Sequence, residues 1–445
     1  MRRLPKRKGV SFGTIAMVTI TGLVILGCSF LLPRFVGQTD IHFNARELAV
    51  AFDRSFDMLA EGQESSTAVS VSHTPGEPLD WVRPVETSVP EPEPITFRLT
   101  AAGCVLVDSN VQKSMASGEG YLLTDLFSLL SGDVVADIAI MTLENTVVST
   151  EKLSDINAPP ELLAALRACG FHVVCLGFNE VFQNGLAGAV ATREAARAAG
   201  LLAYGVYETR AQRDALTFLE VNGLSVALLS YQEEIAASGR KKLSADEQAF
   251  AYGELSLPVI IGDIQHSKVL GAQVVIVSVC WGKKGAEKPT PEQYALAQAM
   301  ADAGADIILG THSGALQPVE VLTANRGSGS RSQTLCAYSL GNLFSNDRKS
   351  RSTISGILLH ANATYHPVTD TMSFDQLSYT PTYVWRGKKD NKTVCAVLPS
   401  DVTPPEYVQG DQLRVMERSL ALVQSIMEET QVSIRRPGSV FLVTE

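Results

Sequence analysis

The chain has 445 residues, of which 45% are hydrophobic and 7 are cysteines. A chain of this length and composition can bury a large core without a disulfide framework, and it has room for one large domain or two smaller ones. Its formal net charge at pH 7 is −10. We expect no nucleic-acid partner, because the chain has no surplus of basic side chains to neutralise phosphates.

The N-terminus carries the features of a membrane anchor. A basic segment, residues 1–9, precedes a nearly uncharged apolar run, residues 10–32. About 20 apolar residues can cross a bilayer as a helix, and positive charge in front of them keeps the N-terminus in the cytoplasm. We therefore expect a single-pass anchor in the cell membrane, with the remaining domain outside the cytoplasm.

An alternative anchor is a lipid on Cys28. The residues Ile25-Leu26-Gly27-Cys28 look like a bacterial lipoprotein cleavage box. The apolar run continues beyond Cys28 instead of turning polar, which favours the uncleaved transmembrane helix.

Two short segments connect this anchor to the folded domain. Residues 33–60 include apolar side chains at helical spacing, which predicts a short amphipathic helix beside the membrane. Residues 61–94 are rich in Ser, Thr, Pro and Glu, a composition that cannot bury enough apolar surface to fold and is typical of a tether. We expect the folded domain at residues 95–405.

The C-terminal segment, residues 406–445, is expected to contain a helix and a tail. After Asp411, apolar side chains recur at three- and four-residue spacing and predict an amphipathic helix that packs on the domain. The stripe consists of Leu413, Met416, Leu420, Val423 and Met427.

The segment between residues 271 and 317 predicts a strand, a helix and a second strand. Val274–Val279 is a buried strand, and a helix begins at Thr290-Pro291-Glu292, where a capping residue, a proline and an acid agree. Ala305–Leu309 is the next strand. A crossover through one helix makes the two strands parallel. Cys280 and His312 therefore follow strands at the edge where open α/β sheets bind ligands.

Further strands and helices precede this segment. Their order predicts a mixed α/β domain in which crossovers come first and antiparallel pieces later. The expected elements are a strand at Ala136–Met141, a helix at Pro159–Cys169, a strand at His172–Leu176, a helix at Thr192–Ala199, a strand at Ala203–Val206, and a hairpin of Ala215–Val221 with Leu224–Tyr231 through Asn222-Gly223.

Between about Thr96 and Asn346 the chain resembles the CapA, or poly-gamma-glutamate capsule synthesis, family. The resemblance is carried by ADIAIMTLEN, PPELLAALRACGFHVVCLGFNE, VNGLSVALLSY, VVIVSVCWG, ADIILGTHSGALQPVEV and AYSLGNLF. It implies a four-layer αββα sandwich similar to the calcineurin-like metallophosphoesterases. It also implies a part in the synthesis, export or attachment of a capsule or other envelope polymer. Other polymer-synthesis subunits and an anionic polymer are the implied partners.

The metal-ligand motifs of that family are degenerate in this chain. The family has Gly-Asp where this chain has Gly103-Cys104, and Asn-Asn-His where it has Phe178-Asn179-Glu180. It has His-Trp-Gly at Cys280-Trp281-Gly282 and His-Pro-His at His312-Ser313-Gly314. The family ligand positions are thus Cys104, Glu144, Asn179, Glu180, Cys280 and His312, of which Glu144, Asn179 and His312 are retained. An intact two-metal centre is not expected, because most of the hard oxygen and imidazole ligands are missing.

Three interpretations of these positions remain open. The favoured one is a retired site in which the cysteines are small buried hydrophobes and no cofactor binds. A second is a disulfide between Cys104 and Cys280. A third is a single site for zinc, or another divalent metal such as manganese, made by Cys104, Cys280, His312 and a carboxylate.

These interpretations divide the expected function into two classes. A retired site predicts a pseudoenzyme that serves as a binding or scaffold subunit. A remodelled Cys/His/Glu site predicts a metal-dependent hydrolase or transferase that acts on an envelope polymer. Both predict that Cys104, Glu144, Asn179, Cys280 and His312 cluster at one edge of the sheet.

Overall fold

The computed structural model describes residues 91–117, 120–147, 154–326, 331–389, 392–428, 430 and 432–434. The basic segment, the apolar run with Cys28, the juxtamembrane helix and all but the last four residues of the tether lie outside these ranges. Among the residues inside them, no helix is both long and apolar enough to cross a membrane.

The larger sheet has nine strands, in the order β18-β17-β16-β1-β4-β7-β8, with β15 beside β1 and β19 beside β17. Strands β1, β4, β7 and β8 are parallel, whereas β16, β17 and β18 form an antiparallel extension. The bounds are β1 (Ile95–Leu106), β4 (Ile138–Leu143), β7 (Val173–Cys175), β8 (Leu202–Tyr204), β15 (Asn342–Ser345), β16 (Ser355–His366), β17 (Thr371–Lys389), β18 (Lys392–Pro399) and β19 (Ser433–Ile434).

The second sheet has six strands in the order β13-β14-β12-β11-β10-β9. The bounds are β9 (Thr217–Val221), β10 (Leu224–Gln232), β11 (Val274–Cys280), β12 (Ile307–Thr311), β13 (Val319–Asn325) and β14 (Arg331–Ala337). Strands β11 and β12 are parallel, as the helical crossover between them predicts. The expected hairpin is also confirmed: β9 and β10 are antiparallel, and Asn222 and Gly223 have φ angles of 51° and 83°.

Helices surround the two sheets, and two two-stranded ladders lie outside them. The helices are α3 (Ser109–Met115), α4 (Glu161–Cys169), α5 (Gly185–Ala198), α6 (Arg210–Ala215), α7 (Ala237–Arg240), α8 (Ala245–Gln248), α9 (Leu257–Val269), α10 (Pro291–Ala303) and α11 (Asp411–Met427). The 3-10 turns are η2 (Leu123–Leu126), η3 (Ser128–Leu130) and η4 (Ser352–Ile354). The ladders pair β2 (Ala116–Ser117) with β3 (Gly120–Tyr121) and β5 (Thr146–Val147) with β6 (Asn157–Ala158).

Local sequence signals explain why one helix boundary was predicted well and another was not. Helix α10 begins after Thr290, whose side chain forms a capping box with Gln293, and it ends at Gly304 with φ of 119°. Helix α5 begins at Gly185, earlier than the expected Thr192. Asn184 is a common N-cap residue, but its side chain makes no capping hydrogen bond there. Gly185 and Gly188, two residues with poor helix propensity, obscure the helical pattern of the first turn.

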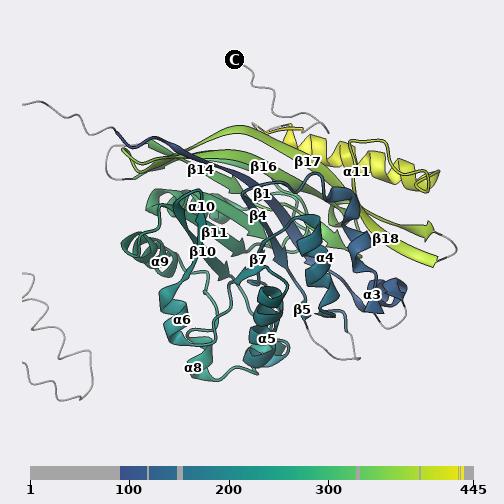
Figure 1. Ribbon diagram of the computed structural model, residues 1–445, viewed down its shortest axis with the longest axis horizontal. Coiled ribbons are helices and arrows are strands. Elements are labelled where there is room, and N and C mark those ends of the chain that lie inside the picture. The colour runs from purple at the N-terminus through teal and green to yellow at the C-terminus, as the bar shows by residue number, and fades with distance from the viewer. Residues whose placement is uncertain are drawn as a thin grey trace, which may run out of the picture. The chain divides into compact units, whose positions relative to one another are not determined.

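The two sheets pack face to face, with helices on both outer faces (Figure 1). Leu99 and Ile140 of the larger sheet share one core with Leu228 and Ile276 of the smaller one. Two further cores, between each sheet and its helices, complete the layers: residues of α4 pack with those of β4, and residues of α9 and α10 pack with those of β11. The fold is therefore the mixed α/β, sheet-rich arrangement that the sequence predicts.

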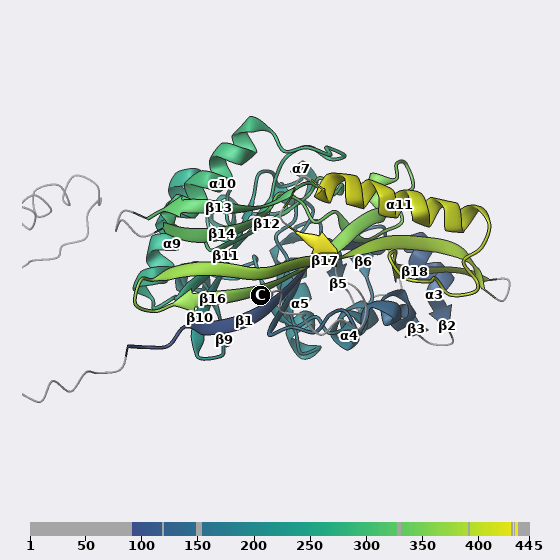
Figure 2. The same ribbon diagram turned by 90° about the horizontal axis from the view of Figure 1, so that it is seen from above.

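Helix α11 lies along β16 and β17, as the views in Figures 1 and 2 show. Met416, Val423 and Met427 of the expected stripe are buried. Leu413 and Leu420 are only half-buried, whereas Ser419 is buried and its Oγ lies 2.6 Å from Ser355 Oγ. The packed face is thus rotated slightly from the expected one, because a serine pair replaces an apolar contact at its centre.

Candidate functional site

The expected site residues lie at strand ends of two sheets and not, as predicted, at the edge of one. Cys104 lies near the end of β1, Glu144 follows β4, and Asn179 and Glu180 follow β7, all in the larger sheet; Cys280 and His312 end or follow strands of the smaller sheet. Their parallel strands point their carboxyl ends toward the same side of the sandwich. The residues meet there because the inner faces of the two sheets share a core.

Cys104 and Glu144 are in direct contact at the centre of this cluster. The Cys104 thiol donates a hydrogen bond to the Glu144 carboxylate. Burial raises the pKa of Cys104 well above its ordinary value, and the charge of Glu144 raises it further, while the backbone N–H of His312 opposes both. A protonated thiol is therefore the stable form at neutral pH.

The pKa of Glu144 is also raised, with burial as the largest cause. The hydrogen bond from Cys104 and the positive charges of His312 and Lys284 lower this pKa, and the charge of Glu180 raises it. The opposing contributions do not cancel the effect of burial. Glu144 is thus a carboxyl group whose charge the surrounding protein disfavours.

Cys280 completes the cluster from the smaller sheet. Its side chain is only 4% exposed. Burial raises the pKa of its thiol, and the charge of Glu144 raises this pKa further. The backbone N–H of Asn179 contacts the sulfur and lowers the pKa. The structure therefore brings together all six positions that the family resemblance indicates.

Backbone packing against the Ser339–Phe344 segment positions Cys104. The backbone N–H of Cys104 donates to the carbonyl oxygen of Gly341 at 3.2 Å. A side chain on Gly103 would place its Cβ 1.9 Å from that same oxygen. The pairing of β1 with β4 also shifts between Ala101 and Cys104. Glycine at position 103 therefore permits the close approach that brings Cys104 to the strand end.

His312 has a backbone conformation that non-glycine residues rarely adopt. Its φ angle is 85°, which costs on the order of 1 kcal/mol for a residue with a side chain. The loop that holds it is fixed by hydrogen bonds: Gly285 N–H donates to Ser313 O at 2.7 Å, and Ser313 Oγ to Ser339 Oγ at 3.0 Å. This conformation directs the His312 amide to the Cys104 sulfur, and such strain is typical of functional positions.

A cleft of about 580 Å³ adjoins the cluster; we call it the strand-end cleft. Asn179, Cys280 and His312 line it, and so do residues that the sequence analysis did not select. The added residues include Glu233, Glu234, Trp281, Lys283, Lys284 and Gln293. Lys283 and Lys284 directly follow Cys280-Trp281-Gly282 in the sequence, so proximity to that motif was the available signal.

Gln232 is a second residue that the sequence analysis missed. It is the register partner of Cys280 on β10 and is 1% exposed. Neither polar atom of its side-chain amide has a hydrogen-bond partner among the described residues. A buried amide without partners is uncommon, but no sequence pattern signals it because Gln232 ends an otherwise ordinary strand.

The donor set does not fit the divalent metal pair that the family resemblance implies. In the part of the chain that the structure describes, no group of three or more His, Cys, Asp or Glu side chains is placed to hold a metal ion. Thiols must lose their protons to bind a metal, and here the pKa values of both are raised. Cys104 and Cys280 are also free, so the disulfide interpretation is not realised in this structure.

Comparison with known proteins gives the same family as the sequence motifs. Residues 98–347, more than half of the chain, match the family described as bacterial capsule synthesis protein PGA_cap. The capsule biosynthesis protein CapA of Bacillus anthracis is 29% identical over an alignment of 280 residues that covers 59% of this chain and 63% of the relative. The PGA biosynthesis protein CapA of Bacillus subtilis (strain 168) is 25% identical over 265 residues, 59% of this chain and 66% of the relative.

The matched part thus spans slightly less than two thirds of the length of these relatives. Among solved structures, the calcineurin-like phosphoesterase YfkN from Bacillus subtilis matches with a TM-score of 0.40 at 12% identity, over 76% of this chain and 100% of that one. The family match covers all six positions of the cluster, from Cys104 to His312. The chain therefore belongs to the PGA_cap family of bacterial capsule synthesis proteins.

Proposed function

We propose that this protein takes part in the synthesis, export or attachment of a capsule or other envelope polymer, as a non-catalytic binding or scaffold subunit. Membership of the PGA_cap family supports the role in capsule synthesis. The two CapA relatives are named for capsule biosynthesis and for PGA biosynthesis. The proposed partners are an anionic polymer and other subunits of the same synthesis machinery.

The contact between Cys104 and Glu144 carries the non-catalytic part of the proposal. In the family pattern, position 104 holds an aspartate and Glu144 is a metal ligand. Here the Glu144 carboxylate accepts a hydrogen bond from a buried thiol instead. Phosphoesterases of this kind stabilise developing charge mainly through their metals. Without them the rate should fall on the order of 10³-fold or more.

Metal binding and turnover of the purified full-length chain test this proposal. We expect no measurable hydrolysis of bis(p-nitrophenyl) phosphate with added manganese or zinc, and no stoichiometric metal. Stoichiometric zinc that disappears in Cys280→Ala but stays in Cys336→Ala, a matched change at another buried free cysteine, would establish a remodelled metal site. The proposal of a non-catalytic subunit would then be wrong.

A variant that restores the missing family ligands also tests whether the cluster is a retired metal centre. Cys104→Asp, Glu180→His and Cys280→His together restore three of the family's ligands. Gly314 is left unchanged, because its φ of 66° would strain a histidine there. We expect the triple variant, but not the parent, to bind manganese. Equal binding by both, or by neither, would argue against a retired metal centre at this cluster.

We further propose that the folded domain acts outside the cytoplasm, tethered by the apolar run at residues 10–32. The basic residues in front of that run support this orientation. Protease added to intact spheroplasts should release a soluble fragment that begins within residues 61–94. Complete protection of the domain until the membrane is lysed would place it in the cytoplasm instead.

A further inference from the structure

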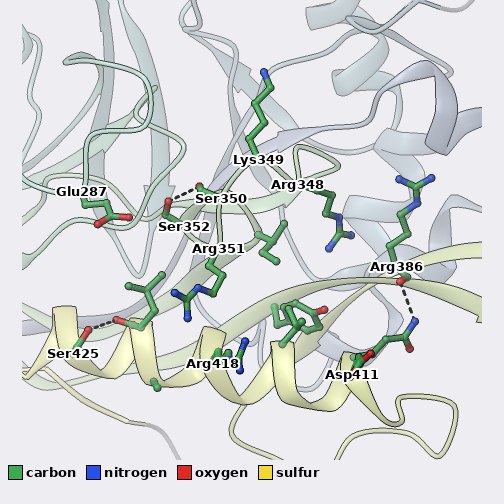
Figure 3. A pocket seen from close by; sticks show the side chains of 16 residues that line it. Glu287, Arg348, Lys349, Ser350, Arg351, Ser352, Arg386, Asp411, Arg418 and Ser425 are labelled. Carbon is green, nitrogen blue, oxygen red and sulfur yellow. Dashed lines mark hydrogen bonds between the residues drawn. The ribbon is translucent and has the colours of Figure 1, made fainter.

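A second cavity, of about 1060 Å³, lies apart from the six-residue cluster, between α11, β17 and the loop that follows β15 (Figure 3). We call it the arginine groove, because its basic lining residues are Arg348, Lys349, Arg351, Arg386 and Arg418. Its acidic lining residues are Glu287 and Asp411. An excess of basic residues is unusual on a chain whose formal net charge is −10.

The basic side chains of the groove have unused hydrogen-bonding capacity. None of the five forms an ion pair with a described residue. Asp411, one of the two acids, is already paired with Arg414 on its own helix. Each guanidinium has five N–H donors and no acceptor, so the groove presents many donors that no protein carboxylate satisfies.

Arg348 is the least exposed of the five. Its Nη1 donates to the carbonyl oxygen of Val384 at 2.6 Å. Its Nε and Nη2 atoms are buried, and the Tyr383 phenol interacts with the guanidinium. A ligand in the groove can therefore reach the exposed guanidinium groups of Arg351 and Arg418, but not these buried atoms of Arg348.

The groove is long and has apolar residues among the charged ones. Residues Asp411, Val415, Arg418, Leu422 and Ser425 form one face of α11 along it, and this face extends for about 21 Å at 1.5 Å per residue. Ile354 and Tyr383 also line it. Figure 3 shows Arg351 extending from the opposite loop toward α11, with Arg348 and Arg386 farther along. One small anion would contact only part of this surface.

From these features we infer that the arginine groove binds an extended polycarboxylate, a linear polymer with repeated carboxylates on a methylene-rich backbone. Arginine forks match carboxylates in bidentate geometry. The apolar side chains would pack against the methylene groups between them. That this polymer is the capsule or envelope polymer itself rests on the proposed function.

A hydrogen-bonded side chain connects the groove to the six-residue cluster. Asn342 pairs with Cys104 across β15 and β1. Its Nδ2 donates to Gly314 O, beside His312, at 3.1 Å and to Thr353 O, in the loop of the groove, at 2.9 Å. A polymer held in the groove would therefore contact a loop that is tied directly to the strand-end residues.

Binding of poly-γ-glutamate to the full-length chain tests the inference. Arg351→Gln with Arg418→Gln should weaken binding at least tenfold, because both side chains are exposed and donate no side-chain hydrogen bond to a described residue. The matched control is Arg167→Gln with Arg331→Gln, two exposed arginines outside the groove. It makes the same change in net charge and should alter binding less than twofold. Equal weakening by both double variants would mean non-specific attraction and would overturn the inference.

Two further experiments distinguish the groove from the strand-end cleft, and a polycarboxylate from a polyphosphate. If Lys283→Gln with Lys284→Gln abolishes binding and the groove variant does not, the polymer binds in the strand-end cleft; the groove inference fails while the proposed function stands. If the parent does not bind poly-γ-glutamate at all, the groove inference fails, whereas the proposed role with another envelope polymer stands. Polyphosphate of equal charge should bind more weakly than poly-γ-glutamate, because it has no methylene groups to pack against Val415 and Leu422. Equal affinity would refute a ligand with a methylene-rich backbone.

Discussion

The Cys104 thiol of β1 donates a hydrogen bond to the Glu144 carboxylate that follows β4. This contact joins one residue that departs from the family pattern to one that is retained. It gives Glu144 a partner within the protein, and burial keeps both groups in an environment that disfavours their charged forms.

The buried thiols predict slow chemical modification. All six cysteines among the described residues are free and buried. In a Cys28→Ser background, the folded chain should react slowly with Ellman's reagent, because the thiolate is the reactive form and burial raises the pKa of Cys104 and Cys280. Unfolding in guanidinium without reductant should expose all six thiols. A count lower by two would reveal a disulfide.

Gly103→Ala should destabilise the fold at the site. The new Cβ would meet the Gly341 carbonyl oxygen at 1.9 Å, so β1 and the Gly341 segment must separate, at a cost of about 1–3 kcal/mol in the free energy of unfolding. Gly262→Ala, in the exposed middle of α9 with open space around it, should stabilise by about 0.5–1 kcal/mol. Urea unfolding measures both changes. Similar effects of the two substitutions would contradict the close approach at Gly103.

Arg326→Met should be strongly destabilising although Arg326 is not one of the six cluster positions. Its Nη2 lies 2.7 Å from Oδ1 of Asp306, a fully buried residue. The other carboxylate oxygen, Oδ2, accepts a hydrogen bond from Val275 N–H at 2.8 Å. Removing the partner leaves a buried charge, which costs about 3–5 kcal/mol. Thermal unfolding of Arg326→Met and of the double variant Arg326→Met with Asp306→Asn checks this. The second change should recover part of the loss, and no recovery would show that the ion pair is not the cause.

Asp401 predicts a pH dependence of stability. Burial raises its pKa to about 6, and the charge of Asp133 adds to this. Its Oδ1 is buried without a hydrogen-bond partner among the described residues. Because the folded-state pKa is above the unfolded one, the folded state favours the protonated form. The resulting stabilisation is present below about pH 4 and is lost as the pH rises through about 6.

Asp401→Asn removes this titration. Relative to the parent, the variant should gain stability between pH 4 and pH 7, by about 1 kcal/mol once solvent screening of the half-buried group is allowed for. Urea unfolding at several pH values gives the difference in the free energy of unfolding. A difference that stays constant over this range would show that Asp401 has an ordinary pKa.

The sequence by itself determined the local elements and the family. The capping box at Thr290, the Asn222-Gly223 turn and the β-branched run of β11 specify structure through interactions between near neighbours in the chain, so they could be read without a fold. The family motifs likewise placed Cys104, Glu144, Asn179, Glu180, Cys280 and His312 at strand ends.

Only the tertiary structure decided that these strand ends belong to two sheets and that the Cys104 thiol contacts Glu144. It also revealed the orphan amide of Gln232 and the arginine groove, whose side chains come from a loop, a strand and a helix between positions 287 and 425. Burial and contact between distant segments depend on how the sheets pack. No pattern of neighbouring residues records that packing, so these features required the fold.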